Sequence, residues 1–282
     1  MSKLLGFKLV IPEDHVVWPS WVVLNTLVAA ELVNLSQQVE LPAGLRRELM
    51  PKHVGLIPDG HRRWAHQRGL SVQQGHSTIG RRLTELTRLC DKWGVQVLTV
   101  YGVSTETLTR PKEELDFLVS IFEEWVKSNM EEWARQNIRF SVIGNKSPLP
   151  RSIEQVLSEA EVALKANSGL HLMVALGYGG RYEILQACKS VSSKVKDGLI
   201  QLQDIDESLF EQELQTKCTK FPSPDLLIRT GGECRVSNFM LWQLAYSEFY
   251  FSKTFFPNYG EADFIEALSS FQQRQRRYGG RS

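Results

Sequence analysis

Apolar residues recur with two different periods along most of this chain. From residue 53 onward, short runs of β-branched and aliphatic residues alternate with longer stretches that place an apolar residue every three or four positions. The short runs predict strands, and the longer stretches predict amphipathic helices. The predicted strands are residues 53–57, 95–103, 138–143, 170–175, 225–228 and 249–251. The predicted helices are residues 79–93, 112–135, 150–167, 182–194, 207–216 and 262–276.

The alternation of strands and helices predicts the fold class. Strands joined by helices of this length are typical of an α/β domain, so we expect a single domain with a mainly parallel central sheet flanked by helices. The sequence contains no internal repeat and no low-complexity tract. We therefore expect an appended N-terminal segment, residues 1–50, followed by the main domain, residues 51–282.

The appended segment contains one predicted amphipathic helix. Trp21, Leu24, Val28, Leu32 and Leu35 fall on one face at helical spacing. This face either covers the domain or a partner subunit, which is the favoured interpretation, or it docks on a membrane. No run of 18 apolar residues occurs, so the sequence predicts a soluble protein with no transmembrane segment. It shows neither a signal peptide nor the Arg-rich, Ser-rich composition of a transit peptide.

Composition and charge make several classes of function unfavourable. The 33 basic and 32 acidic residues leave a net charge of +1, so the bulk charge predicts no nucleic-acid partner. The 4 cysteines form no CxxC pair and the 6 histidines form no HExxH motif. This pattern predicts reduced thiols and no zinc site. Any site for an anion must therefore come from the local placement of residues.

The first candidate site is residues 58–64, directly after a predicted strand. Gly60 allows close approach of a ligand to the backbone, and the start of a following helix offers free N–H groups to a phosphate. Arg62 and Arg63 add positive charge, and the Asp59 carboxylate is a suitable oxygen ligand for Mg²⁺. The alternative is an ordinary strand-to-helix turn with a solvated pair of arginines.

Two further segments follow predicted strands in the same way. Residues 103–111 carry Ser and Thr hydroxyls that suit ligand oxygens, although they also suit the N-cap of a helix with Pro111 in its first turn. In residues 225–239, Arg229 and Arg235 flank a glycine pair, and Ser237 follows. Guanidinium groups and backbone N–H groups in this arrangement can surround a diphosphate. The alternative is a loop that binds no ligand.

The order of these three segments resembles the cis-prenyltransferases, of the undecaprenyl and dehydrodolichyl diphosphate synthase type. The resemblance covers about residues 50 to 280 and points to the plant short-chain branch, such as neryl or lavandulyl diphosphate synthases. The DDxxD motif of trans-prenyltransferases is absent. Further matching blocks are Gly75-His76 and residues 177–181, 241–246 and 276–280.

The resemblance implies a role for each matching residue. Asp59 would hold Mg²⁺ on an allylic diphosphate, with His76 and Ser104 close to the reacting groups, and Glu248 would share the metal. The tail with Arg277 and Gly279 would complete the partner subunit's site, which implies a homodimer. The residues implied to bind the isoprenoid diphosphate substrates are Gly60, Arg63, Trp64, Arg110, Arg229, Arg235 and Ser237.

This sequence departs from the family pattern where the reacting ends of the substrates would meet. His61 replaces the usual asparagine, Val72 replaces a basic residue, and residues 103–108 lack the usual aromatic residues and asparagine. The departures reflect either drift within a short-chain branch or altered chemistry, in which two dimethylallyl diphosphates couple irregularly to lavandulyl diphosphate. Because imidazole titrates near neutrality, His61 would then relay or remove a proton.

We therefore predict a Mg²⁺-dependent prenyltransferase that condenses C5 isoprenoid diphosphates and releases diphosphate. The alternatives are a regular head-to-tail synthase of neryl or longer cis-polyprenyl diphosphate, and a non-catalytic partner subunit. Bulky residues in the predicted helix 112–135, among them Phe122, Trp125 and Trp133, would either shorten a product tunnel or pack in the core. The resemblance to plant enzymes implies the plastid stroma, and otherwise the cytoplasm.

Overall fold

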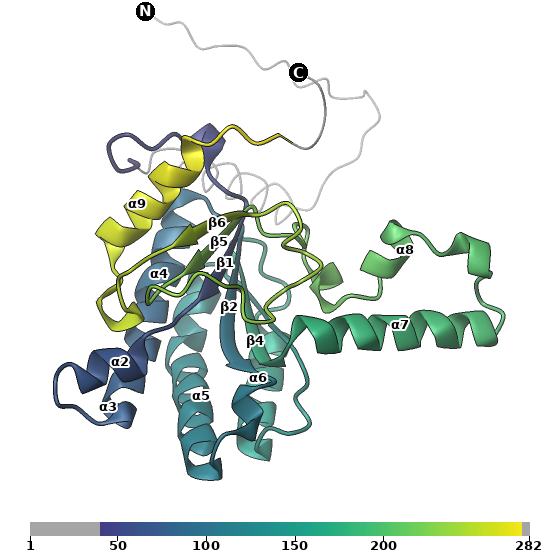
Figure 1. Cartoon of the computed structure of the whole chain (residues 1–282), viewed down its shortest axis with the longest axis horizontal. Coiled ribbons are helices and arrows are strands. Elements are labelled where there is room, and N and C mark those ends of the chain that lie inside the picture. Colours follow the sequence, from purple (N-terminus) through teal and green to yellow (C-terminus); the bar gives the residue numbers. More distant parts are fainter. Residues whose placement is uncertain (1–39, 278–282) are drawn as a thin grey trace, which may run out of the picture. The chain divides into compact units, whose positions relative to one another are not determined.

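The computed structural model describes residues 40–277, which contain one six-stranded sheet (Figure 1). The strand order is β3-β4-β2-β1-β5-β6, and every neighbouring pair is parallel. This confirms the predicted α/β fold class, and each of the six predicted strands is present. The strands are β1 (His53–Ile57), β2 (Val97–Ser104), β3 (Arg139–Ile143), β4 (His171–Tyr178), β5 (Leu226–Arg229) and β6 (Glu248–Phe251).

The helices follow the strands as predicted, with three differences. The predicted helix 207–216 ends after five residues, and a separate 3-10 turn occupies Gln215–Cys218. Two short helices, α2 (His61–His66) and α3 (Val72–His76), are not among the predicted ranges, because six and five residues are too few to show a helical period; a capping box between Ser71 and Gln74 begins α3. The helices are α2 (His61–His66), α3 (Val72–His76), α4 (Ile79–Trp93), α5 (Lys112–Arg135), α6 (Arg151–Ala163), α7 (Gly180–Lys196), α8 (Glu207–Glu211) and α9 (Glu261–Gln272).

Both faces of the sheet are covered, which explains why β1 and β4 are buried along their whole length and consist mainly of apolar residues. Helices α4, α5, α6 and α9 contribute to one core cluster, in which the ring of Trp93 stacks on Phe264 with centroids 5.6 Å apart. On the other face, Phe239, Met240 and Leu244 cover the sheet with irregular backbone. Two bulky residues of α5, Trp125 and Trp133, contact each other in the first core, as the packing interpretation predicts.

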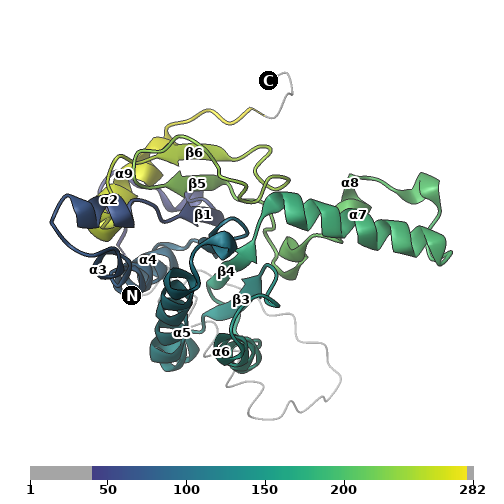
Figure 2. The same cartoon turned by 60° about the horizontal axis from the view of Figure 1, so that its bottom comes forward.

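Helix α7 extends away from the sheet, and α8 lies beside it (Figures 1 and 2). Residues 41–277 belong to one compact unit. Leu45 and Met50 already belong to the core of this unit. The predicted amphipathic helix around residues 21–35 lies outside the described residues. Within residues 40–277, no helix is long and apolar enough to cross a membrane.

Candidate active site

The three candidate segments meet around one cavity of about 920 Å³. Each segment follows a strand of the same parallel sheet, namely β1, β2 or β5. Because parallel strands place their carboxyl ends at one edge, the segments converge although they are far apart in the sequence. The cavity is lined both by charged residues and by apolar side chains, including Ile79, Leu118 and Phe122.

Asp59 lies directly after β1 and is held on both sides. Its Oδ1 accepts a hydrogen bond from the backbone N–H of Gly60 at 2.6 Å, and its Oδ2 lies 2.8 Å from Nη2 of Arg229. The Thr230 hydroxyl lies 2.8 Å from both the backbone N and the backbone O of Asp59. Burial alone would raise the pKa of Asp59, but the hydrogen bond and charge of Arg229 outweigh it and lower the pKa. Asp59 is therefore ionised at neutral pH.

Gly60 is required by both its backbone and its surroundings. Its φ of 104° is left-handed, and a Cβ atom there would lie 2.5 Å from the ring of Phe255. This close turn places His61, two residues after Asp59, at the start of α2.

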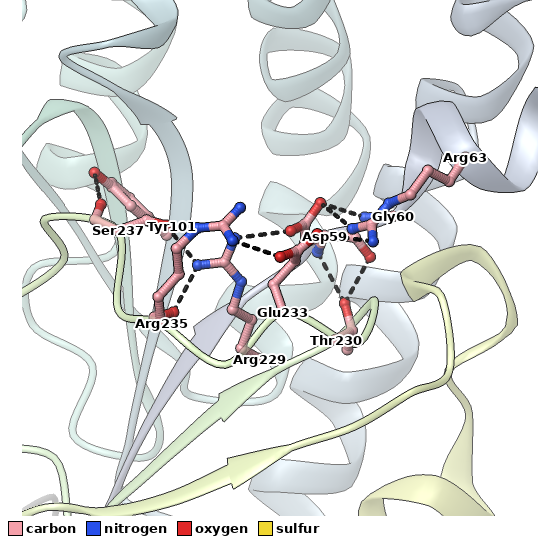
Figure 3. A network of polar contacts seen from close by, with 9 residues as sticks. All are labelled: Asp59, Gly60, Arg63, Tyr101, Arg229, Thr230, Glu233, Arg235 and Ser237. Carbon is pink, nitrogen blue, oxygen red and sulfur yellow. Dashed lines mark hydrogen bonds and ion pairs between the residues drawn. The ribbon is translucent and has the colours of Figure 1, made fainter.

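Arg229 connects the Asp59 side of the site with the loop after β5 (Figure 3). It is the last residue of β5 and is only 4% exposed. Its Nη1 donates to the carbonyl oxygen of Arg235 at 2.6 Å and to Oγ of Ser237 at 2.5 Å, while Nη2 contacts Asp59. One buried guanidinium thus contacts residues of both predicted diphosphate pockets.

Glu233 is a residue of this network that the sequence did not single out. Its carboxylate pairs with Nη1 of Arg63 at 3.0 Å and also with Arg235. In Figure 3 the carboxylates of Asp59 and Glu233 lie between Arg63 on one side and Arg229 and Arg235 on the other. The glycine pair before it marked this loop as a candidate site. An acidic residue in a loop is usually exposed to solvent, so nothing in the sequence alone assigns Glu233 a role in the site.

The imidazoles of His61 and His76 lie side by side in the cavity wall, with centroids 5.4 Å apart. Gly75 permits this contact, because a Cβ there would lie 2.5 Å from the carbonyl oxygen of His61. Within the described residues, Nε2 of His61 and Nδ1 of His76 are buried and have no hydrogen-bond partner. Burial, reinforced by His76, lowers the pKa of His61 to about 3; burial, reinforced by Arg110, lowers the pKa of His76 to about 4. Both rings are neutral at neutral pH.

Ser104 and Arg110 also line the cavity. Oγ of Ser104 accepts a hydrogen bond from the backbone N of Thr107 at 3.0 Å, and Arg110 pairs with Glu114 of α5 at 3.0 Å. Pro111 directly precedes α5, and no side chain of this segment caps that helix. The hydroxyl groups of residues 103–111 therefore do not form the N-cap of α5, and their binding of a ligand stays a prediction.

The remaining predicted site residues are not brought to this cavity. Trp64 donates from Nε1 to Asn258 at 2.8 Å and does not line the cavity. Arg277 contacts Gln275 near the end of the described chain, and Gly279 lies outside it.

Glu248 lies at the amino ends of the strands, whereas Asp59 lies at their carboxyl ends. Glu248 is the first residue of β6, level with Leu226 of β5 and through it with Val54 of β1, and it pairs with Arg274. Asp59 follows Val54 by five residues, about 16 Å further along the strand direction. Within one chain the two carboxylates therefore cannot bind the same metal ion.

Phe122 of α5 and Gly102 of β2 both line the cavity. The pairing of β2 with β4 is irregular around Gly102, and a Cβ at this glycine would lie 2.9 Å from the Phe122 ring and 2.8 Å from Leu176. The absence of a side chain at Gly102 thus lets Phe122 approach the strand. Phe122 belongs both to the core and to the cavity wall, so the packing interpretation is confirmed and a limit on product length stays a prediction.

Comparison with known proteins finds similar chains over most of this length. Residues 57–279 match the family described as "Putative undecaprenyl diphosphate synthase". The chain is 56% identical over 233 residues to the chloroplastic (2Z,6Z)-farnesyl diphosphate synthase of Solanum lycopersicum, covering 83% of this chain and 80% of that protein. It is 52% identical over 236 residues to the chloroplastic nerylneryl diphosphate synthase of the same plant, covering 84% and 73%.

A solved structure is similar over the same region. The crystal structure of lavandulyl diphosphate synthase from Lavandula x intermedia, in complex with dimethylallyl diphosphate, superposes with a TM-score of 0.81 at 45% identity. The match covers 83% of this chain and all of that chain.

Proposed function

The chain belongs to the cis-prenyltransferase family, and from this we propose that it is a short-chain enzyme that condenses C5 isoprenoid diphosphates with release of diphosphate. The observation that carries the proposal is one cavity that is lined both by two sets of arginine-containing residues and by apolar side chains. Two anionic head groups need two cationic pockets, and an apolar chain needs a dry region that ends after a short distance.

The first pocket, formed by Asp59, Gly60 and Arg63, would bind the diphosphate that departs. Mg²⁺ in proteins is commonly held by one or two carboxylates together with substrate phosphates. Asp59 fits this pattern, because its side chain is 31% exposed and lines the cavity. Residues 40–277 contain no cluster of three or more metal-binding side chains, so substrate oxygens would supply the other ligands. The ion would stabilise the negative charge that develops as the allylic C–O bond breaks.

The second pocket would bind the diphosphate of the other substrate through Arg229, Arg235 and Ser237. The exposed end of Arg235 and the Ser237 hydroxyl both line the cavity. A diphosphate there would take the place of Glu233 as the counter-charge of Arg235. Ser104, on the neighbouring strand end, would lie close to the reacting groups.

His61 would take part in the choice of product. Its buried, neutral ring carries an Nε2 without a hydrogen-bond partner among the described residues, and this atom can form a hydrogen bond with a substrate group. Burial, reinforced by the neighbouring His76, lowers the pKa of His61 to about 3, so the ring is a weaker base than a solvated imidazole and the expected proton exchange near neutral pH does not hold for the folded chain.

Two products remain in competition under this proposal. Irregular coupling of two dimethylallyl diphosphates to lavandulyl diphosphate is supported by the similar lavender structure. Regular head-to-tail addition of isopentenyl diphosphate is supported by the farnesyl and nerylneryl diphosphate synthases. A non-catalytic partner subunit is disfavoured, because Asp59, Arg229 and Arg235 occur together in one cavity.

The proposal also covers the oligomeric state of the protein and its compartment in the cell. We infer a homodimer from the resemblance of the tail around Arg277 and Gly279 to the Arg-x-Gly motif of the family. We infer the plastid from the chloroplastic relatives.

One incubation series tests the proposed function. The purified chain is supplied with Mg²⁺ and dimethylallyl diphosphate alone, and then with isopentenyl diphosphate added, and both released diphosphate and prenyl products are identified. A branched C10 product from the first mixture would establish irregular coupling, and a linear cis product from the second would establish regular coupling. No diphosphate release in either mixture would contradict the enzymatic assignment and favour the partner-subunit alternative.

A further inference from the structure

Three loops at the carboxyl edge of the sheet meet at one side chain, that of Asn238. Its Nδ2 donates to Oε1 of Glu106, in the loop after β2, at 2.8 Å. Its Oδ1 accepts from the backbone N–H of Arg181, in the first turn of α7, at 2.9 Å. Its carbonyl oxygen accepts from the N–H of Gly180 at 2.6 Å. Asn238 itself belongs to the loop after β5, so this residue connects that loop to both others.

The backbone at this point adopts an unfavourable conformation. Ser237, Asn238 and Met240 have φ values of 46°, 62° and 42°, in the left-handed region that L-residues other than glycine rarely adopt. Each such residue costs roughly 1 kcal/mol or more and persists only where surrounding contacts hold it. Asparagine tolerates this conformation better than most residues. The bonds of Asn238 are therefore suited to offsetting the strain of the loop.

The strained backbone directs groups of the second diphosphate pocket. At Ser237 it places Oγ 2.5 Å from Nη1 of Arg229, and the Ser237 carbonyl oxygen lies 3.2 Å from the hydroxyl of Tyr101. The same Arg229 nitrogen is bonded to the carbonyl oxygen of Arg235, so a shift of the loop would move the serine and the second arginine together.

The fit around Asn238 is close. A Cβ at Gly179 would lie 2.7 Å from Nδ2 of Asn238 and 2.5 Å from Oγ1 of Thr105. A Cβ at Gly180 would lie 2.8 Å from Leu241. Two consecutive glycines thus let the turn between β4 and α7 pass directly against the loop. Neither Asn238 nor Glu106 is buried, so these bonds contribute little to the core.

We propose that Asn238 is a positioning residue of the second diphosphate pocket, which it holds in its binding geometry through Glu106 and the turn at Gly180 and Arg181. The inference rests on the proposed function, since that assigns the pocket to the second substrate. Loosening this connection should weaken binding of isopentenyl diphosphate, while binding of dimethylallyl diphosphate in the Asp59 pocket changes little.

The test exploits the polarity of the bond between Asn238 and Glu106. Asn238→Asp keeps the acceptor for Arg181 and tolerates the left-handed backbone, but it places two carboxylates opposite each other. We expect the KM for isopentenyl diphosphate to rise about tenfold or more, with a KM for dimethylallyl diphosphate within about twofold of wild type. In the double variant Asn238→Asp with Glu106→Gln, the new amide donates to the new carboxylate and the bond is restored in reverse. The KM for isopentenyl diphosphate should then return to within about threefold of wild type.

Asn137 offers a matched control. It is also a left-handed asparagine, with a φ of 58°, and its side chain also bridges to another loop, through Ser168. It lies just before β3, at the amino ends of the strands, whereas the site lies at their carboxyl ends. Asn137→Ala should lower the melting temperature about as much as Asn238→Ala and leave both KM values unchanged.

Binding of inorganic pyrophosphate without Mg²⁺, measured by calorimetry in the same variants, tests the pocket without turnover. Asn238→Asp should weaken this binding about tenfold, and the double variant should restore it. An unchanged affinity and KM in Asn238→Asp, or no recovery in the double variant, would overturn the inference. A wild-type chain that binds no pyrophosphate would overturn it too. A chain that binds pyrophosphate and shows these effects, but releases no diphosphate from prenyl substrates, would contradict the proposed function alone.

Discussion

The buried guanidinium of Arg229 depends on the charges around it. It is 4% exposed, and Asp59 is the carboxylate that contacts it directly, while Glu233 pairs with the neighbouring arginines. Asp59 and Glu233 have equally exposed side chains, at 31% each, and both pair with arginines. They differ in their proposed roles, because only Asp59 is proposed to bind Mg²⁺.

This difference predicts unequal effects of removing each charge. Asp59→Asn should lower diphosphate release by about a hundredfold or more at saturating Mg²⁺, because the charge acts where negative charge develops. Glu233→Gln should lower it less than about tenfold. Steady-state release assays and melting temperatures of both variants provide the measurement. An equal loss in the two variants would mean that Asp59 acts only by ordering the arginines.

The imidazole of His61 leads to a second prediction at the same scale. His61→Asn restores the side chain usual in the family, so regular coupling should increase relative to branched coupling. Products from mixed dimethylallyl and isopentenyl diphosphates are quantified by mass spectrometry. His171→Asn, which changes another buried histidine at the opposite edge of the sheet, serves as the control and should leave the ratio unchanged. An identical ratio in wild type and His61→Asn would remove His61 from product choice.

At the scale of elements, α5 contacts β2 in the wall of the cavity. Phe122 lines the cavity, and Gly102 leaves room for its ring. Trp133 lies on the same helix and is 2% exposed, but it packs against Phe140 and does not line the cavity. The helix therefore carries one large residue in the cavity wall and another that packs in the core.

Shortening Phe122 should lengthen the product. Phe122→Ala should allow at least one more C5 unit to be added and cost about 3–5 kcal/mol of stability, whereas Phe122→Leu should give a smaller effect on both. Trp133→Leu should lower stability by a comparable amount without changing product length. Product length by mass spectrometry and urea unfolding of the three variants separate the two effects. Longer products from the Trp133 variant would show that general loosening of α5 is sufficient.

At the scale of the whole molecule, neutral histidines are buried near both the amino ends and the carboxyl ends of the strands. Burial lowers the pKa of His53 and His61 to about 3, and that of His76 and His171 to about 4. Unfolded histidine binds a proton near pH 6.5, so below that pH the unfolded chain takes up protons that the folded chain does not. The stability due to these groups is therefore present above pH 6.5 and is lost as the pH falls toward 3.

This linkage predicts acid sensitivity. Between pH 6 and pH 5 each of these histidines should remove up to about 1.4 kcal/mol of unfolding free energy per pH unit. Urea unfolding at pH 7.5, 6.0 and 5.0 gives the slope directly. His171→Asn should make the slope shallower by up to one proton. Equal stability at pH 7.5 and pH 5.0 would show that these histidines are protonated in the folded protein as readily as in the unfolded chain.

The amino-acid sequence by itself determined the elements and their order. Apolar runs such as that of β4 report burial on both faces, and this information is local, so all six strands and the parallel α/β class could be predicted. Asp59, Arg229 and Ser237 could also be singled out, because charge, glycine and position after a strand are visible in one dimension. The five-residue helix α3 could not, since its length hides any period.

Only the tertiary structure decided which of these residues act on one another. The partners Asp59 and Arg229 are separated by 170 positions, and Asn238 and Glu106 by 132, so no local pattern links them. The register of the sheet separated Glu248 from Asp59, although both are acidic residues next to apolar strands. Close packing, which depends on side chains from distant segments, decided that Phe122 lines the cavity while Trp133 does not. Contact and burial are properties of the folded chain, and composition and spacing do not contain them.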